Sequence, residues 1–114
     1  MAIDIPALMQ EITQAASTVI NEDITKLRGF SERQLKALAT QANLIAQGVL
    51  SGAIDEELRD YFLDSLEDMA LNFAKTLRGL LMITLEKVWN SIVGVLWNAI
   101  GKATGITLLT PTLD

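Results

Sequence analysis

The chain contains no histidine and no cysteine among its 114 residues. These side chains serve most often as general bases, nucleophiles and metal ligands, so catalysis would need a hydroxyl or amine activated by a lysine or a carboxylate. Ser51, Ser65 and Ser91 lie in no recognisable catalytic motif, and the glycines match neither GxGxxG nor GxxxxGK[ST]. We therefore expect a protein that is not an enzyme and uses no cofactor.

Proline is almost absent, and aromatic residues are few. Pro6 and Pro111 lie near the two ends, so no proline interrupts the middle of the chain. Apolar residues make up 50% of the sequence, and Ala, Leu and Ile favour helices. Charged residues make up only 20%, where about 25% is usual. The composition predicts an all-α protein with more apolar surface than one monomer can hide.

Positive charge is scarce and unevenly distributed. Residues 1–68 carry 12 acidic and 5 basic side chains, whereas residues 69–114 carry 2 and 4. Nucleic acid is not an expected partner, because basic side chains that neutralise phosphates supply most of that affinity. The first residues lack the basic region of a secretory signal. We expect a location in the cytoplasm or within a particle rather than secretion.

Apolar spacing predicts a helical hairpin over residues 1–50. The first helix begins at Pro6, which suits the first helical position, and ends at Gly29, which tolerates a left-handed conformation. Ser31 is a favourable N-cap for the second helix, and Gln34 can complete a capping box. The apolar stripe of the first helix is Leu8, Ile12, Ala16, Ile20, Ile24 and Leu27.

A second helical region is predicted over residues 55–103, after a break at 49–54. Gly79 can end this helix, kink it or lie within a continuous helix, since one glycine costs only about 1 kcal/mol in a helix interior. Residues 104–114 are expected to form an extended tail. We interpret 1–114 as a single helical domain in which three or four helices form a hairpin or bundle.

The helix predicted from Leu80 to Ala103 is apolar around most of its circumference. Such a helix must be covered by protein or by lipid. Because the stripes of the first two helices are narrow and rich in alanine, we expect them to cover only part of it. A homo-oligomer or another protein partner would cover the rest, with Asn90 and Asn98 fixing the register. The predicted interface is Leu85, Val88, Trp89, Ile92, Val93, Leu96, Trp97 and Ile100.

Two alternatives remain open. Residues 80–109 can form an interfacial or inserting membrane segment, with Trp89 and Trp97 within about 80° of each other around the helix axis. The uncharged run Val88–Gly101 is about 14 residues long, which is short for a membrane span. The third possibility is a helical bundle that holds an apolar ligand.

Asp60, Asp64 and Asp68 are four residues apart and share one helix face. Such a face could hold a divalent cation or a basic partner, but the EF-hand pattern is missing, and di-iron bundles need histidine. We expect a solvated acidic surface and no metal. The sequence thus predicts a non-enzymatic structural or interaction protein that self-associates or docks into a larger assembly. A phage particle or prophage-encoded complex is one such setting, although no residue pattern specifies it.

Overall fold

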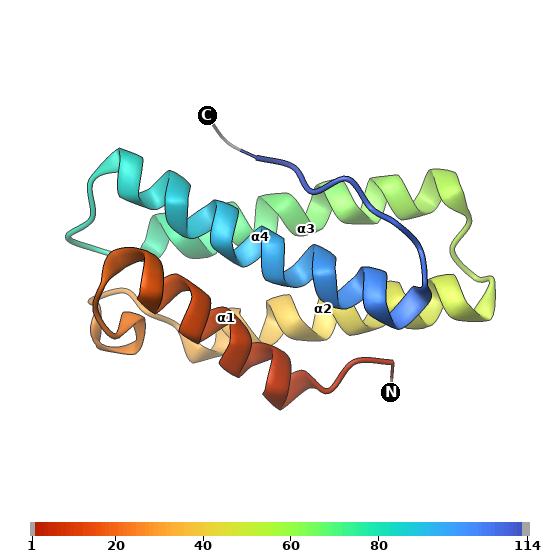
Figure 1. The fold of residues 1–114 in the computed structure, drawn as a ribbon, viewed down its shortest axis with the longest axis horizontal. Helices are drawn as coiled ribbons and strands as arrows, with labels where there is room; N and C mark the ends of the chain where they lie inside the picture. Colours follow the sequence, from red (N-terminus) through yellow and green to blue (C-terminus); the bar gives the residue numbers. More distant parts are fainter. Residues whose placement is uncertain (1, 113–114) are drawn as a thin grey trace.

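The computed structural model describes residues 2–112, in which four α-helices pack as an antiparallel bundle (Figure 1). Each helix packs against the next along the chain, and α4 closes the bundle against α1. Helix α4 also contacts α2, so all three other helices touch it. The predicted all-α fold is confirmed. The elements are α1 (Ile5–Ile20), the 3₁₀ turn η1 (Ile24–Lys26), α2 (Glu32–Ser51), α3 (Glu56–Thr76) and α4 (Met82–Thr104).

Helix α1 ends earlier than its apolar spacing predicts. It ends at Ile20 rather than Gly29, because Asn21 takes a left-handed conformation (φ 59°). The backbone N–H of Ile24 then donates to Ser17 Oγ at 3.0 Å. Asparagine tolerates the left-handed region, and a serine side chain can replace a helical partner. Ile24 belongs to η1, and its side chain is nevertheless buried in the core. The four-residue spacing of apolar residues therefore continues beyond the end of the helix.

The predicted starts of α2 and α3 are confirmed. Ser31 is the N-cap of α2, and its Oγ accepts from the Gln34 backbone N–H at 3.2 Å. Asp55 is the N-cap of α3, and its carboxylate accepts from the Leu58 N–H at 2.8 Å. Gly52 ends α2 in a left-handed conformation. These boundaries follow from hydrogen bonds within four residues, which explains why the sequence predicts them.

Two helices occupy the region predicted as helical over 55–103, so of the outcomes left open around Gly79 the structure has a break. Helix α3 ends at Thr76, and α4 begins at Met82. Gly79 lies between them with φ 85°. The backbone N–H of Arg78 donates to the carbonyl oxygen of Arg28 at 2.8 Å, which ties this connection to the loop after η1. Gly79 therefore belongs to a turn, and the tertiary contact with residue 28 fixes that turn.

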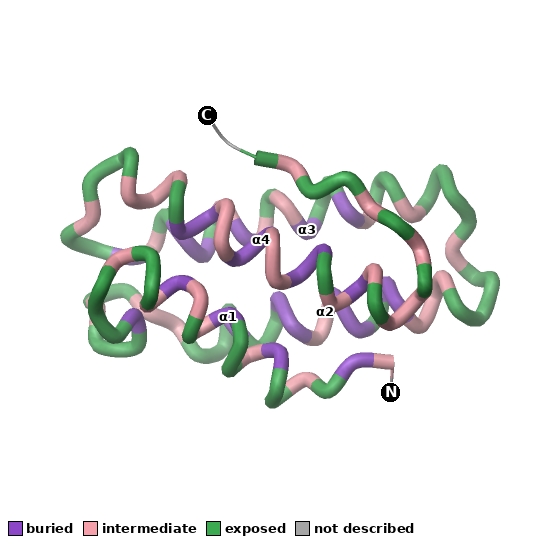
Figure 2. The backbone as a smooth tube through the Cα atoms, in the orientation of Figure 1, coloured by how far each residue is buried: buried purple, intermediate pink, exposed green. Residues whose placement is uncertain are grey.

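The core lies along α4 and draws apolar side chains from every helix and from η1 (Figure 2). Two segments outside the helices also reach it. Ile3 packs at the N-terminal side, where its backbone N–H donates to the buried Asn43 Oδ1 at 2.9 Å. After Gly105 the chain leaves α4 and turns back over the bundle, where Leu108 packs against the core (Figure 1). The predicted tail is free of helix over 105–112, and its last two residues lie outside the described part of the chain.

Gly29 and Gly79 offer a matched test of this packing. Both have φ near +85°, but a Cβ at Gly29 would overlap the carbonyl oxygen of Thr76, whereas a Cβ at Gly79 meets nothing within 4 Å. We expect Gly79→Ala to lower the free energy of unfolding by about 1 kcal/mol, the cost of the left-handed backbone alone. Gly29→Ala should cost at least about 3 kcal/mol, because the loop must also move away from α3.

Chemical denaturation of the two variants beside the parent chain measures both costs. Equal losses of stability would contradict the close approach of Gly29 to the end of α3.

Candidate interaction surface

The side chains predicted to form an interface on α4 lie mostly inside the chain's own core. In the folded monomer they are covered, and they hold α4 against its neighbours. Val93→Asp or Leu96→Asp would therefore place a charge in this core and unfold the monomer, so neither change can report on assembly alone. The buried set is Val88, Trp89, Ile92, Val93, Leu96, Trp97 and Ile100, and Leu85 is partly buried.

Helices α1 and α2 cover part of α4, as expected, but they are not its only cover within the chain. Helix α3 also packs on α4, and the alanines of the other helices let the helices approach closely. The alanine-rich stripes, which were expected to cover only part of α4, thus bring their helices close to it. The fully buried alanines are Ala16, Ala39, Ala42, Ala46, Ala70 and Ala74.

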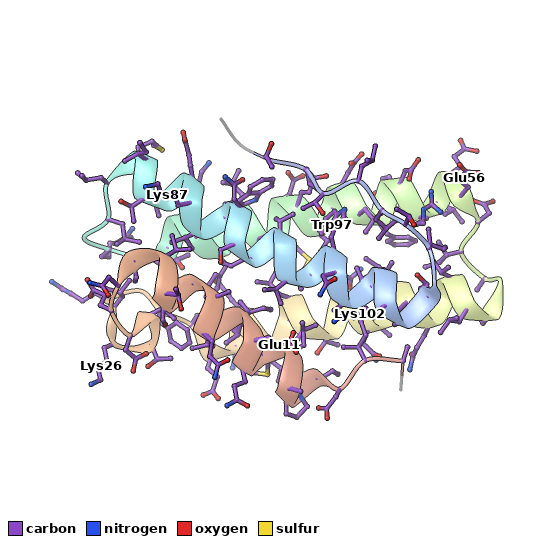
Figure 3. The ribbon with its side chains drawn as sticks, viewed as in Figure 1. Glu11, Lys26, Glu56, Lys87, Trp97 and Lys102 are labelled. Atoms are coloured by element: carbon purple, nitrogen blue, oxygen red, sulfur yellow. The ribbon has the colours of Figure 1, made fainter. Side chains whose placement is uncertain are left out.

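Both tryptophans belong to this core. Trp89 and Trp97 expose only 4% and 3% of their surface. Trp89 Nε1 donates to the backbone carbonyl oxygen of Glu67 at 3.1 Å, which joins α4 to α3. Trp97 lies between the same two helices (Figure 3). No helix within residues 2–112 has the length and hydropathy needed to cross a bilayer.

The asparagines predicted to set an oligomer's register lie on the outer stripe of α4. Asn98 is exposed, and Asn90 is half-buried. Their register role stays a prediction. The buried asparagine is instead Asn43, which the sequence reading missed. Its signal is a polar residue spaced four and three residues from Ala39 and Ala46, on the buried side of α2.

An acidic face covers the outer side of α3. It consists of Glu57, Asp60, Asp64 and Asp68, all exposed, with Tyr61 exposing 68% of its surface among them. Tyr61 is four residues after the first of these acids and three before the third, so it projects from the middle of the acidic face. No three acidic side chains within residues 2–112 are placed to hold a metal ion.

Three successive apolar residues are exposed at the end of the bundle where α4 begins, and we call them the apolar tip. Leu81, Met82 and Ile83 expose 75%, 69% and 61% of their surface at the start of α4. Leu81 is the N-cap, and it supplies no side-chain hydrogen bond to the first turn. Figure 2 shows the exposed backbone at this end. The sequence reading missed the apolar tip because it treated these residues as part of one continuous apolar helix.

Basic residues lie at the same end of the bundle as the apolar tip, where the acidic Asp23 and Glu86 are sequence neighbours of Lys26 and Lys87. The hydrogen bond between Arg78 N–H and the Arg28 carbonyl holds two exposed arginines at the same end of the bundle. Lys26 and Lys87 lie toward this end too, while Glu56 lies toward the other (Figure 3). We call these two arginines and two lysines the basic end. The protein is therefore acidic overall, but it has basic residues beside the apolar tip.

A hollow of about 630 Å³ lies between α1, η1 and the start of α2. Its apolar lining includes Met9, Phe30 and Leu35, and polar Thr25 and Glu32 line it as well. It opens at the surface beside exposed residues. This hollow is a candidate place for an apolar ligand.

Glu67, at the inner edge of the acidic face, makes the free energy of unfolding depend on pH. Partial burial raises the pKa of Glu67 above its ordinary value of 4.5, and the charge of Asp64, a hydrogen bond with Asp64 and the charge of Asp68 add to this. Because the folded pKa is raised, the contribution of Glu67 to stability is complete below about pH 4.5. It is lost as the pH rises through the folded pKa. Ionised Glu67 therefore opposes folding at neutral pH.

We expect Glu67→Gln to raise the melting temperature at pH 7, with a gain that shrinks as the pH falls toward 4.5 and is lost below it. Glu22→Gln removes the same charge from an exposed loop position and serves as the control. Thermal unfolding of both variants from pH 4 to pH 7 measures the difference. A gain that is identical for the two variants would contradict the role of burial at Glu67.

No protein-family model, curated protein or solved structure matches this chain. Functional assignment therefore rests on the surfaces described above. The apolar tip with its basic end and the acidic face are the two parts of the surface that differ most from an ordinary solvated helix.

Proposed function

We propose that this chain is a non-enzymatic helical interaction protein, which self-associates or docks into a larger assembly through its C-terminal helix. The contact is made by the apolar tip at the start of α4, since the rest of the apolar side of α4 is buried in the monomer. The observation that carries this proposal is the exposure of Leu81, Met82 and Ile83 in immediate succession. Contiguous exposed apolar residues commonly mark interaction sites.

The structure around the apolar tip supports its use as a contact. Other parts of α4 are covered from outside the helices: Ile3 and Leu108 pack against the core near its C-terminal end. Helix α1, its antiparallel neighbour, has 16 residues against 23 in α4. At a rise of about 1.5 Å per residue, α1 is shorter by roughly 10 Å and cannot cover both ends. Figure 1 shows the end of α1 beside the start of α4, so the extra length of α4 lies at its C-terminal end, where Ile3 packs. The apolar tip is exposed because the buried residues of α4 begin only at Val88.

The size of the apolar tip sets a limit on what it can do alone. Full burial of a large apolar side chain contributes about 1.5–3 kcal/mol, so these partly exposed residues supply on the order of 3–6 kcal/mol in total. Association costs an estimated 4–15 kcal/mol in lost freedom of movement. The apolar tip therefore needs further contacts, and the arginines beside it are the nearest polar groups that can provide them.

The distribution of polar groups supports a role without catalysis. The chain has no histidine or cysteine, and most carboxylates of α3 are exposed to solvent. Nothing in this arrangement pairs a nucleophile with a base. Binding through the apolar tip is the simpler use of this surface.

A membrane surface is the second candidate partner. The observation in its favour is the position of Arg28 and Arg78 beside the apolar tip, because basic residues flank apolar ones in proteins that bind anionic lipid. In this alternative only the start of the predicted membrane segment 80–109 contacts the lipid. The overall charge of −5 works against it at low ionic strength.

Replacing the apolar tip by Leu81→Ser, Met82→Ser and Ile83→Ser tests the proposed function. We expect the triple variant to lose at least about tenfold in affinity for the assembly, while its melting temperature stays the same or rises. A rise is expected because serine at the N-cap position contributes about 1 kcal/mol to helix stability. Light scattering over a concentration series and thermal unfolding give the two measurements.

Leu44→Ser is the matched control, because Leu44 is an exposed leucine on α2. Unchanged assembly in the triple variant would contradict the role of the apolar tip. A loss of assembly in the control to the same degree would show that general surface hydrophobicity drives association.

A further inference from the structure

We infer that the partner of the apolar tip is the acidic face of a second copy of this chain, so that copies associate head to tail. This inference rests on the proposed function and names the partner of the same site. It joins two surface features that have no use in the fold of one copy: an apolar tip among arginines at one end, and an exposed tyrosine among carboxylates toward the other.

The two surfaces are complementary in charge. Arg28 and Arg78 are exposed beside the apolar tip, and Asp64 and Asp68 are exposed on the acidic face. Arginine forms two parallel hydrogen bonds with a carboxylate, which gives such pairs a defined geometry. A surface of one sign that meets the other sign also speeds the encounter of partners and fixes their orientation.

The two surfaces are also complementary in their apolar parts. Tyr61 projects from the acidic face, and Leu58 lies three residues before it and is 44% exposed. Tyrosine and arginine are the residue types that most often carry the energy of an interface. The ring of Tyr61 can pack against apolar Met82 or Ile83 and can accept an arginine on its face. The contacts missing from the apolar tip alone are thus available on another copy.

One copy cannot satisfy both surfaces by itself. The molecule measures 42 × 28 × 18 Å, and α3 begins at the end of the bundle opposite the start of α4 (Figure 1). At physiological ionic strength charges are screened over about 8 Å, so the two ends do not neutralise each other. Within the described residues, the ion pair of the acidic face joins Asp60 to Arg59 of the same helix. The complementary charges become neighbours only between copies.

The overall composition favours this partner over the alternatives. A lipid surface rich in anionic headgroups would meet a protein with a net charge of −5. A second copy would carry the same net charge, but it also presents a local acidic face with an aromatic residue at its centre. Contact between two different surfaces leaves one of each unused on every dimer, so association continues into longer chains or closes into a ring.

Reciprocal charge reversal tests the inference. Arg28→Glu with Arg78→Glu makes the basic end acidic, and Asp64→Lys with Asp68→Lys makes the acidic face basic. We expect each double variant alone to self-associate at least about tenfold more weakly than the parent chain, because it sets like charges against each other. An equimolar mixture should recover association, because the unchanged basic end of one variant meets the unchanged acidic face of the other.

Light scattering after size exclusion, over a concentration series at low and high salt, gives the readout. Association of the parent chain should weaken with salt, while thermal unfolding of each variant should show an intact fold. Recovery in the mixture supports head-to-tail contact. Loss in both variants without recovery overturns it, as does a parent chain that stays monomeric at millimolar concentration.

A companion measurement separates this inference from the proposed function. The parent chain and the triple serine variant of the apolar tip are incubated with vesicles that contain anionic lipid. Binding that needs the apolar tip, by a parent chain that does not self-associate, would overturn the second copy as partner and favour the membrane. If the serine variant matches the parent in both vesicle binding and self-association, the apolar tip has no role and the proposed function fails with it.

Discussion

The arrangement of the bundle follows from the need to keep the apolar circumference of α4 away from water. Three helices pack on α4, and the tail from Gly105 turns back over the bundle near its last turn. The alanines on the covering helices make this possible, because small side chains allow the helices to approach closely. Trp89 adds a directional contact from α4 to the backbone of α3. Each of the other helices lies where it covers part of the apolar surface of α4.

This coverage decides which residues remain for interaction. The long apolar side of α4 is buried in the core of one chain. A partner can therefore contact only the apolar residues that the other helices leave exposed. Helix α1 is shorter than α4, and Ile3 and Leu108 reach the core from outside the helices. The buried residues of α4 begin at Val88, so its first turn with Leu81, Met82 and Ile83 stays exposed. The acidic side chains of α3 follow the same logic, since they take the only side of that helix that faces solvent.

Local signals in the sequence predicted much of the fold, and contacts between distant residues explain the rest. The cap at Ser31 depends on a bond within three residues, so the sequence was enough to place it, and the start of α3 near residue 55 was placed in the same way by its acidic first turn. The turn at Gly79 depends on Arg28, fifty residues earlier, and no local pattern reveals it. Periodicity also showed that α4 must be covered without showing by what. The apolar tip was missed because periodicity does not show where along α4 that cover begins, which is at Val88.

The separation of core and candidate contact has a consequence for how association would be controlled. In an obligate oligomer the interface completes the core, and folding cannot be divided from assembly. Here the buried side chains of α4 belong to one copy, whereas Leu81, Met82 and Ile83 contribute little to the fold. On the proposed function, the monomer is complete and assembly is governed by concentration and salt. Because the apolar tip is too small to hold a partner alone, the charged residues beside it decide which partner is accepted.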